Sequence, residues 1–209
     1  MVKYTNKPIA ITGPHPVRGF TMLEIIVVLA IAAILAMGTI PSLKDAIERN
    51  GRESAMQNLI TAISVARTEA VTQGRTVAIC RSINQAACAA STGGDWDDGW
   101  IIFSDAGVAG TLDGTDALVR VYGPSNDQSV IKLQTRTNGT FASDYLQFNS
   151  DGFLKNSTTG AYFKFCAKDN VATKTRAILL SNTGRPTLSA TVANGSTQKD
   201  LAGAALVCP

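Results

Sequence analysis

Histidine is nearly absent from this 209-residue chain, which has a single one, His15. The chain therefore lacks the imidazole groups that Ser-His-Asp catalysis, Cys-His catalysis and most zinc sites require. It also contains no Walker-type glycine loop, no dinucleotide-binding fingerprint, no Gly-x-Ser-x-Gly and no Cys-x-x-Cys. These absences predict a protein that is not an enzyme and that holds neither a cofactor nor a metal.

Aromatic residues and net charge are also scarce. Aromatic residues make up 6% of the chain, and 19 basic against 16 acidic residues give a formal net charge of +3. This balance is not that of a strongly basic nucleic-acid binder, and 45% hydrophobic residues are too many for a disordered chain. The length suits one modest domain with an appendage.

A long apolar run follows a basic start. Residues 1–19 hold three basic residues and no acidic one, and Glu24 is the only charged residue between Phe20 and Leu43. As a helix, this run would reach about 36 Å at about 1.5 Å per residue, enough to cross a bilayer core of about 30 Å. The basic flank should stay in the cytoplasm, which places the rest of the chain outside.

A cleavable secretory signal is the alternative explanation of this run, with a small-residue cleavage site between Ala30 and Ala36. Glu24 argues against it, because a carboxylate costs roughly 2.5–3.5 kcal/mol at the middle of a membrane helix and less near an interface. An acidic residue retained inside a membrane helix is by default functional and needs a partner. The sequence therefore favours a retained helix.

Residues 19–24, Gly-Phe-Thr-Met-Leu-Glu, followed by the apolar run resemble the class III signal of type IV pilins and type II secretion pseudopilins. The resemblance implies that a prepilin peptidase cuts after Gly19, that Phe20 is N-methylated, and that Glu24 meets the N-terminal amine of a neighbouring subunit. Opposite charges buried together avoid the cost that each would bear alone, and their pairing would fix the axial register of a filament.

The same resemblance implies partners and a location. The partners would be other major and minor pilins or pseudopilins, the peptidase, and the assembly platform of the inner membrane. The protein would be a single-pass protein of that membrane with a periplasmic C-terminal domain, and it would reach the pilus at the cell surface after assembly.

Helical periodicity continues beyond the apolar run and is expected to end near Gln73, with Gly74 as the stop. Apolar residues at three- and four-residue steps predict one buried stripe, formed by Ala55, Leu59, Ala62, Ile63, Ala66 and Ala70. Gly38 and Pro41 are the expected break, since proline removes a backbone hydrogen bond and clashes with the preceding turn. The expected segments are a leader at 1–19, a transmembrane or filament-core helix at 20–41 and an amphipathic helix at 42–74.

From residue 75 to 209, short apolar runs alternate with turn residues, which predicts strands. The candidate strands are 76–81, 99–103, 117–122, 130–134, 145–148, 162–166, 176–180 and a short one at 185–188. Asn138-Gly139 and Asp151-Gly152 are hairpin-type turn pairs. No second long amphipathic helix is predicted, so the fold class is α+β, with the long N-terminal helix packed on an antiparallel sandwich or pair of sheets.

Four segments resemble, in their order along the chain, the GspH/FimT family of minor pilins and pseudopilins: 66–71, 94–105, 148–152 and 182–186. The resemblance implies a minor pilin that enters or primes a type IV pilus and supports assembly, twitching motility and adhesion. A secretion pseudopilin and a DNA-binding minor pilin for natural transformation are the alternatives. Trp96 and Trp100 are expected to pack where the helix meets the sheet, because the aspartates beside them lack the spacing of a twelve-residue calcium loop.

The last sixty residues hold seven basic and three acidic residues. The candidate contacts to double-stranded DNA are Lys164, Lys168, Lys174, Arg176 and Arg185. Basic side chains hold phosphates by counterion release, which makes binding strongly salt-dependent. The DNA-associated tail of the family resembles Gly-Arg-x-Arg, but Thr187 replaces the second arginine here, so a solvated basic face is the preferred interpretation.

Four cysteines allow three pairings, and export to an oxidising compartment predicts disulfides. Cys80 and Cys88 are eight residues apart and could close a local loop. Cys166 and Cys208 would instead tie a strand to the end of the chain, a closure worth roughly 3–4 kcal/mol in the chain-entropy model.

Overall fold

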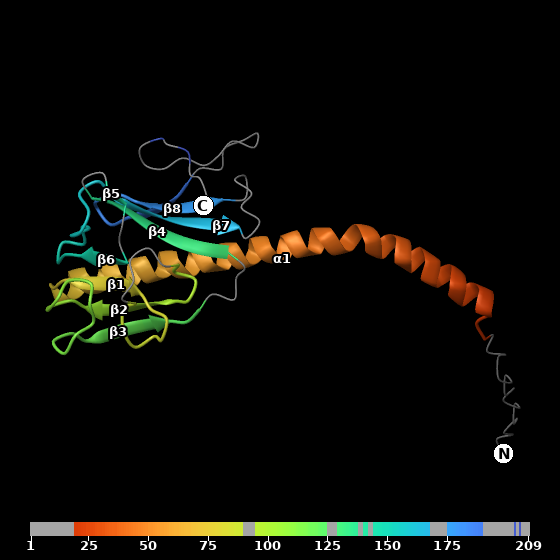
Figure 1. Cartoon of the computed structure of the whole chain (residues 1–209), viewed down its shortest axis with the longest axis horizontal. Coiled ribbons are helices and arrows are strands. Elements are labelled where there is room, and N and C mark those ends of the chain that lie inside the picture. The colour runs from red at the N-terminus through yellow and green to blue at the C-terminus, as the bar shows by residue number, and fades with distance from the viewer. Residues whose placement is uncertain are drawn as a thin grey trace, which may run out of the picture. The chain divides into compact units, whose positions relative to one another are not determined.

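The computed structural model describes the chain at residues 19–89, 95–124, 129–137, 140–141, 144–167, 175–189, 203 and 205. The chain divides into two compact units, Met1–Lys44 and Asp45–Pro209, and each is treated separately. The elements are labelled in Figure 1. The boundary between the units falls three residues after the predicted segment boundary at 41.

One long helix, α1, runs from Met22 to Gln73. Its helical backbone continues through Gly38 and Pro41, and a kink at these two residues stays a prediction. Proline lacks the backbone N–H of one hydrogen bond in the helical ladder, and the backbone stays helical on both sides of Pro41. Across the described residues, no helix combines the length and the hydropathy required of a membrane span.

The end of α1 is where the sequence predicts it. Gly74 has a φ of 63°, and the N–H of Arg75 donates to the carbonyl of Ala70 at 3.2 Å. This six-to-one bond across a left-handed glycine is the Schellman arrangement, which satisfies a free carbonyl at the helix end.

Two antiparallel sheets form the rest of the second unit, as the sequence predicts. The first has the order β3 (Leu118–Tyr122), β2 (Trp100–Ser104), β1 (Val77–Arg81) and β6 (Tyr145–Phe148). The second has the order β5 (Thr140–Phe141), β4 (Ser129–Thr137), β7 (Ala161–Ala167), β8 (Arg176–Leu180) and β9 (Pro186–Leu188). Residues 138–139, the first predicted turn pair, lie outside the described residues.

The main core lies between the stripe of α1 and one face of each sheet. The predicted stripe residues of α1, together with Met56, are at most 2% exposed. They share one cluster with residues of both sheets, among them Ile79, Ile102 and Phe163. Trp96 and Trp100 belong to this cluster, which confirms their predicted packing, and the Trp96 ring meets Phe163 edge-on at 5.0 Å. The helix is therefore an integral part of the domain core.

Candidate functional site

Thr21 caps the start of α1. Its Oγ1 accepts the N–H of Glu24 at 3.2 Å, and its carbonyl accepts the N–H of Ile25 at 3.2 Å. A threonine followed three residues later by glutamate is the sequence of a capping box. Glu24 also places its charge in the first turn, where the helix dipole is positive. The residue assigned to assembly by resemblance therefore also stabilises the helix start.

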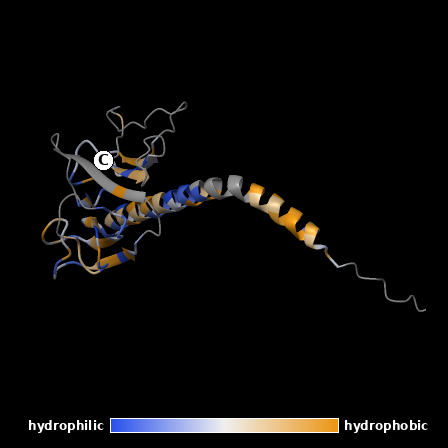
Figure 2. Ribbon diagram, turned by 45° about the vertical axis from the view of Figure 1, so that its right-hand side comes forward, coloured by the Kyte–Doolittle hydropathy of each residue, from blue (hydrophilic) through white to orange (hydrophobic). Residues whose placement is uncertain are grey.

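Large apolar side chains cover all sides of the first turns of α1. From Phe20 to Leu35, those of Phe, Met, Leu, Ile and Val are 47% to 87% exposed, and Met22 is the most exposed. Figure 2 shows this part of α1 in orange, the colour of hydrophobic residues. A helix that is apolar all round is found buried in protein or lipid, so these turns need surroundings that a single chain does not supply.

Arg67 joins the end of α1 to both sheets. Its Nε donates to the carbonyl of Gly152 at 3.1 Å and to that of Thr183 at 3.2 Å. Gly152 follows β6 of the first sheet, and Thr183 follows β8 of the second. Hydrogen bonds from a charged donor are stronger than neutral ones. Three of the four segments of the family resemblance thus meet at one point, which we call the Arg67 junction.

Two glycines allow the turns of the Arg67 junction to approach each other. Gly152 and Gly184 have φ values of 78° and 72°, in the left-handed region. A Cβ on Gly184 would lie 2.5 Å from the carbonyl oxygen of Gly152, and one on Gly152 would lie 2.9 Å from Val71 Cγ2. Asn149 Oδ1 accepts the N–H of Asp151 at 3.1 Å, which confirms the predicted Asp151-Gly152 turn.

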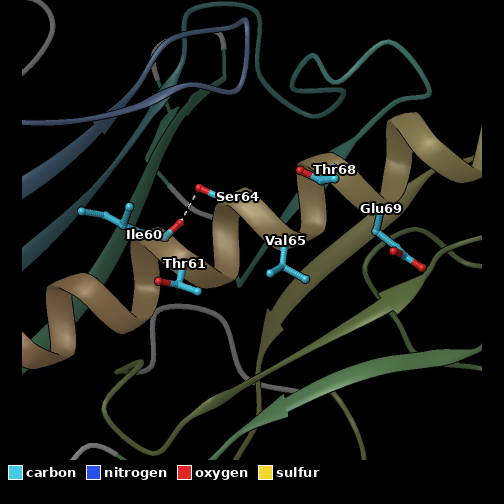
Figure 3. A pocket seen from close by; sticks show the side chains of 6 residues that line it. All are labelled: Ile60, Thr61, Ser64, Val65, Thr68 and Glu69. Atoms are coloured by element: carbon cyan, nitrogen blue, oxygen red, sulfur yellow. Dashed lines mark hydrogen bonds between the residues drawn. The ribbon is translucent and has the colours of Figure 1, made fainter.

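A shallow groove of about 370 Å³ runs along α1. The described residues that line it are Ile60, Thr61, Ser64, Val65, Thr68 and Glu69. The hydroxyls of Thr61 and Ser64 donate to helix carbonyls at 2.8 Å, and Figure 3 shows the Ser64 bond. Thr61 and Ser64 therefore offer a methyl and a methylene group to the groove. Glu69 is the only charged residue among the described residues that line it. A substrate site would require several converging polar groups.

Of the predicted DNA contacts that the structure describes, only Arg185 is exposed. Lys164 on β7 is only 6% exposed, which argues against it as a phosphate ligand. Arg176 is half-buried, and its Nη1 donates to the carbonyl of Thr175 at 3.1 Å. Lys168 and Lys174 lie outside the described residues. Arg185, beside the Arg67 junction, is exposed.

Cys80 and Cys88 form a disulfide, as predicted. The closed loop is also fixed by Asn84, whose Oδ1 accepts the N–H of Ala86 at 3.1 Å and that of Ala87 at 3.0 Å. Cys166 is disulfide-bonded as well. Cys208, its predicted partner, lies outside the described residues.

Asp105 was not singled out from the sequence, because its side-chain partner Gln147 lies 42 residues further along the chain. It is 5% exposed, and its Oδ2 accepts the N–H of Gly110 and Nε2 of Gln147, both at 2.8 Å. Burial raises the pKa of the Asp105 carboxyl above its usual value, although these two hydrogen bonds lower it. Asp105 therefore ties the loop after β2 to β6.

Asp113 and Asp116 shape the same loop through hydrogen bonds from its backbone. The hydroxyl of Thr115 donates to Asp113 at 2.6 Å, and this bond, with the N–H groups of Val108 and Thr115, lowers the pKa of Asp113. Asp116 accepts the N–H of Ala106 at 2.8 Å. The carboxylates are therefore used by the turn itself.

Comparison with known proteins agrees with the geometry. Residues 55–184 match the family model of Type II transport protein GspH, and residues 15–40 match the prokaryotic N-terminal methylation motif. No curated protein matches the chain. The chain is similar to the type IV minor pilin FimU of Pseudomonas aeruginosa strain PAO1, with a TM-score of 0.51, 23% identity, and coverage of 69% of this chain and 92% of that one. A second crystal form of FimU gives a TM-score of 0.48, 22% identity, and coverage of 66% and 93%.

The first of these likenesses shows a shared fold, with an N-terminal helix packed on antiparallel sheets. The methylation motif and the family imply a membrane-anchored structural subunit that assembles with other pilins or pseudopilins. The GspH family model matches more than half of the length of this chain, so the chain belongs to the GspH family.

Proposed function

We propose that this protein is a minor subunit of a type IV pilus, which enters the filament or primes its assembly and thereby supports twitching motility and adhesion. The observation that carries the proposal is the start of α1, where Glu24 is the only charged residue among exposed apolar side chains. An unpaired carboxylate is costly in apolar surroundings, so it needs an opposite charge there. The shared fold of FimU, itself a type IV minor pilin, supports the pilus as the assembly.

The opposite charge would come from processing. A prepilin peptidase would cut after Gly19, and the new N-terminal amine of Phe20 would be methylated. In a filament, Glu24 of one subunit would pair with this amine of its neighbour. Before assembly, the apolar turns would anchor the protein in the inner membrane, with the second unit in the periplasm and the assembly platform as its partner.

Replacement of Glu24 tests this proposal. Glu24→Val should lower the amount of protein in sheared filaments at least about tenfold, because an amine buried without its partner costs roughly 3–5 kcal/mol. The amount in the membrane fraction should not change. Glu53→Val, which removes an exposed carboxylate in the second half of α1, is the matched control and should enter filaments normally. Normal entry of Glu24→Val would contradict the proposal.

A type II secretion pseudopilin is the second candidate, because the matched family model bears that name. A pseudopilin would use the same apolar turns and the same Glu24 pair in a short periplasmic fibre. Deletion of the gene distinguishes the two. Loss of twitching with normal secretion of proteins supports the pilus, and the opposite pattern supports the secretion system.

DNA binding is a third candidate that rests on the exposed Arg185. The measurement is a shift of duplex DNA in electrophoresis at low and at physiological salt. A shift that persists at physiological salt and is lost in Arg185→Ala, but not in Arg120→Ala, would favour DNA binding. No shift at low salt would remove this candidate, since phosphate contacts are strongest there.

A further inference from the structure

Three of the four sheet edges in the described part of the chain are protected. Lys155 N–H donates to the carbonyl of Gln147 at 2.7 Å, and Asn156 Nδ2 donates to that of Tyr145 at 2.9 Å, so a neighbouring segment covers β6. β9 has three residues and begins with Pro186. β5 has only two residues and pairs with β4 only at Arg136 and Thr137, and beyond β5 the carbonyl of Ile131 in β4 accepts the N–H of Trp96 at 2.7 Å. Short strands, proline and covering segments are the usual means by which proteins prevent unwanted strand pairing.

Among the described residues, the fourth edge, β3, has none of these three protections, although its pairing with β2 shifts register between Ile102 and Phe103. Every residue of β1 and β2 is buried, whereas all five residues of β3 are exposed or half-buried. Figure 1 shows β3 at the outer side of its sheet, beyond β2. Leu118 and Val121 are 48% and 40% exposed, although the β2 residues opposite them, Phe103 and Ile101, are fully buried. Apolar surface therefore extends from the core to an open edge.

The hydrogen-bond ladder shows which groups of β3 point outward. Ser82 N–H donates to the carbonyl of Gly99 at 3.0 Å, and Ser104 N–H donates to that of Ala117 at 2.9 Å. In an antiparallel sheet, successive residues bond to opposite neighbours, so even-numbered residues of β2 bond to β3. Arg120 and Tyr122 face Ile102 and Trp100 in this register. The N–H and C=O of Val121 therefore point away from the sheet.

We propose that β3 is a docking edge, to which an extended segment of a neighbouring pilin-type subunit adds as a further strand. This inference rests on the proposed function, which supplies such neighbours. The added strand would bond to the outward N–H and C=O of Val121 and place apolar side chains beside Leu118 and Val121.

The charge of β3 indicates what the added strand carries. Arg120 is the only charged residue of β3, and it is exposed. If two copies of β3 paired along all five residues, Arg120 would lie opposite itself, and like charges directly opposite are destabilising. The added strand therefore belongs to a different subunit and carries a carboxylate opposite Arg120.

Site-specific photo-cross-linking of the full chain in its own host tests this proposal. A photoreactive amino acid replaces Leu118 in one variant and Leu188 in the control, since Leu188 on the protected edge β9 is 49% exposed, almost the same as Leu118. We expect an adduct with another pilin-type subunit, identified by mass spectrometry, from position 118 only.

Two pairs of substitutions then examine the edge itself. Val121→Pro removes the outward N–H and leaves the bonds to β2, so the adduct should fall at least about fivefold, the factor expected for one hydrogen bond. Val121→Thr keeps the N–H and should keep the adduct. Arg120→Glu should reduce the adduct and Arg120→Lys should not, and this pair remains informative if Val121→Pro does not fold.

The other outcomes overturn the inference in distinguishable ways. An adduct of two copies of this chain would show that β3 pairs with itself. It would refute the claim that the added strand belongs to a different subunit. Absence of the adduct from a chain that still enters sheared filaments would refute the docking edge and leave the proposed function intact. A chain that enters no filament and forms no adduct would refute both.

Discussion

The two halves of α1 are both rich in apolar residues, yet they expose them in opposite ways. In the first turns, large apolar side chains from Phe20 to Leu35 are 47% to 87% exposed. In the second half, the stripe from Ala55 to Ala70 is at most 2% exposed. The apolar stripe of the second half therefore packs within its own domain, whereas the apolar surface of the first turns is available to partners.

The buried apolar side chains of the second half of α1 are also smaller than the exposed ones of its first turns. Four of the seven buried stripe residues are alanines: Ala55, Ala62, Ala66 and Ala70. Small side chains allow sheets to pack closely on a helix, which suits a fixed intramolecular core. The first turns carry mostly isoleucine, valine and leucine, whose large surface is useful only when lipid or another helix covers it.

The largest effect on the free energy of unfolding should come from an isoleucine-to-alanine substitution, made once in each half of α1 and compared between the halves. Ile63→Ala should lower the free energy of unfolding by about 2–5 kcal/mol, because Ile63 is fully buried between helix and sheets. Ile34→Ala, at a side chain that is 71% exposed, should leave unfolding of the domain unchanged. Urea unfolding of the full chain in detergent measures both. Equal losses would show that the two halves do not differ as described.

A loss of stability of similar size should come from the turns that receive the end of α1. Gly184→Ala should cost about 3 kcal/mol or more, because the left-handed backbone and the contact with the carbonyl of Gly152 both oppose a Cβ. Gly74→Ala is the matched control, since Gly74 is also left-handed but has open space around it, and it should cost only about 1–2 kcal/mol. If the two variants lose the same free energy of unfolding in urea, the close approach of the turns at the Arg67 junction does not add to the cost of Gly184→Ala.

The smallest effects should be pH-dependent and confined to the second unit. The raised pKa of Asp105 means that its contribution to stability is present below the usual value of 3.8 and is lost as the pH rises through the folded-state pKa. Asp105→Asn should remove this loss. The lowered pKa of Asp113 means that its contribution is present above 3.8 and is lost as the pH falls through the folded-state pKa. Asp113→Asn should remove the acid-side loss, and urea midpoints between about pH 2.5 and 7 compare the variants.

Local patterns predicted most of the fold. The helix limits agree within two residues, since the stripe period and Gly74 are local signals, and all eight predicted strands are present. β4 extends three residues beyond its predicted end, and β5 was missed because two residues give no alternation. The helical backbone at Pro41 agrees with the helix expected from Phe20 to Gln73.

The site was predicted only where its residues are neighbours in sequence. The stretch from Gly19 to Glu24 is compact enough to identify from the sequence. The role of Arg67 depends on turns more than eighty residues away, and no local signal connects them. The burial of Lys164 was also missed, since its alternation with Phe163 and Phe165 suggests an open face. That face of the second sheet is buried as well, as Tyr162 and Ala177 show.

The Arg67 junction has a mechanical consequence. The guanidinium of Arg67 donates hydrogen bonds to the carbonyl groups of two turns, one after a strand of each sheet. Arg67 lies near the end of a helix that starts at Met22. Tension applied along that helix would reach both sheets through the same cation and would be shared between them. The domain would then resist pulling as one body, and neither sheet would peel away before the other.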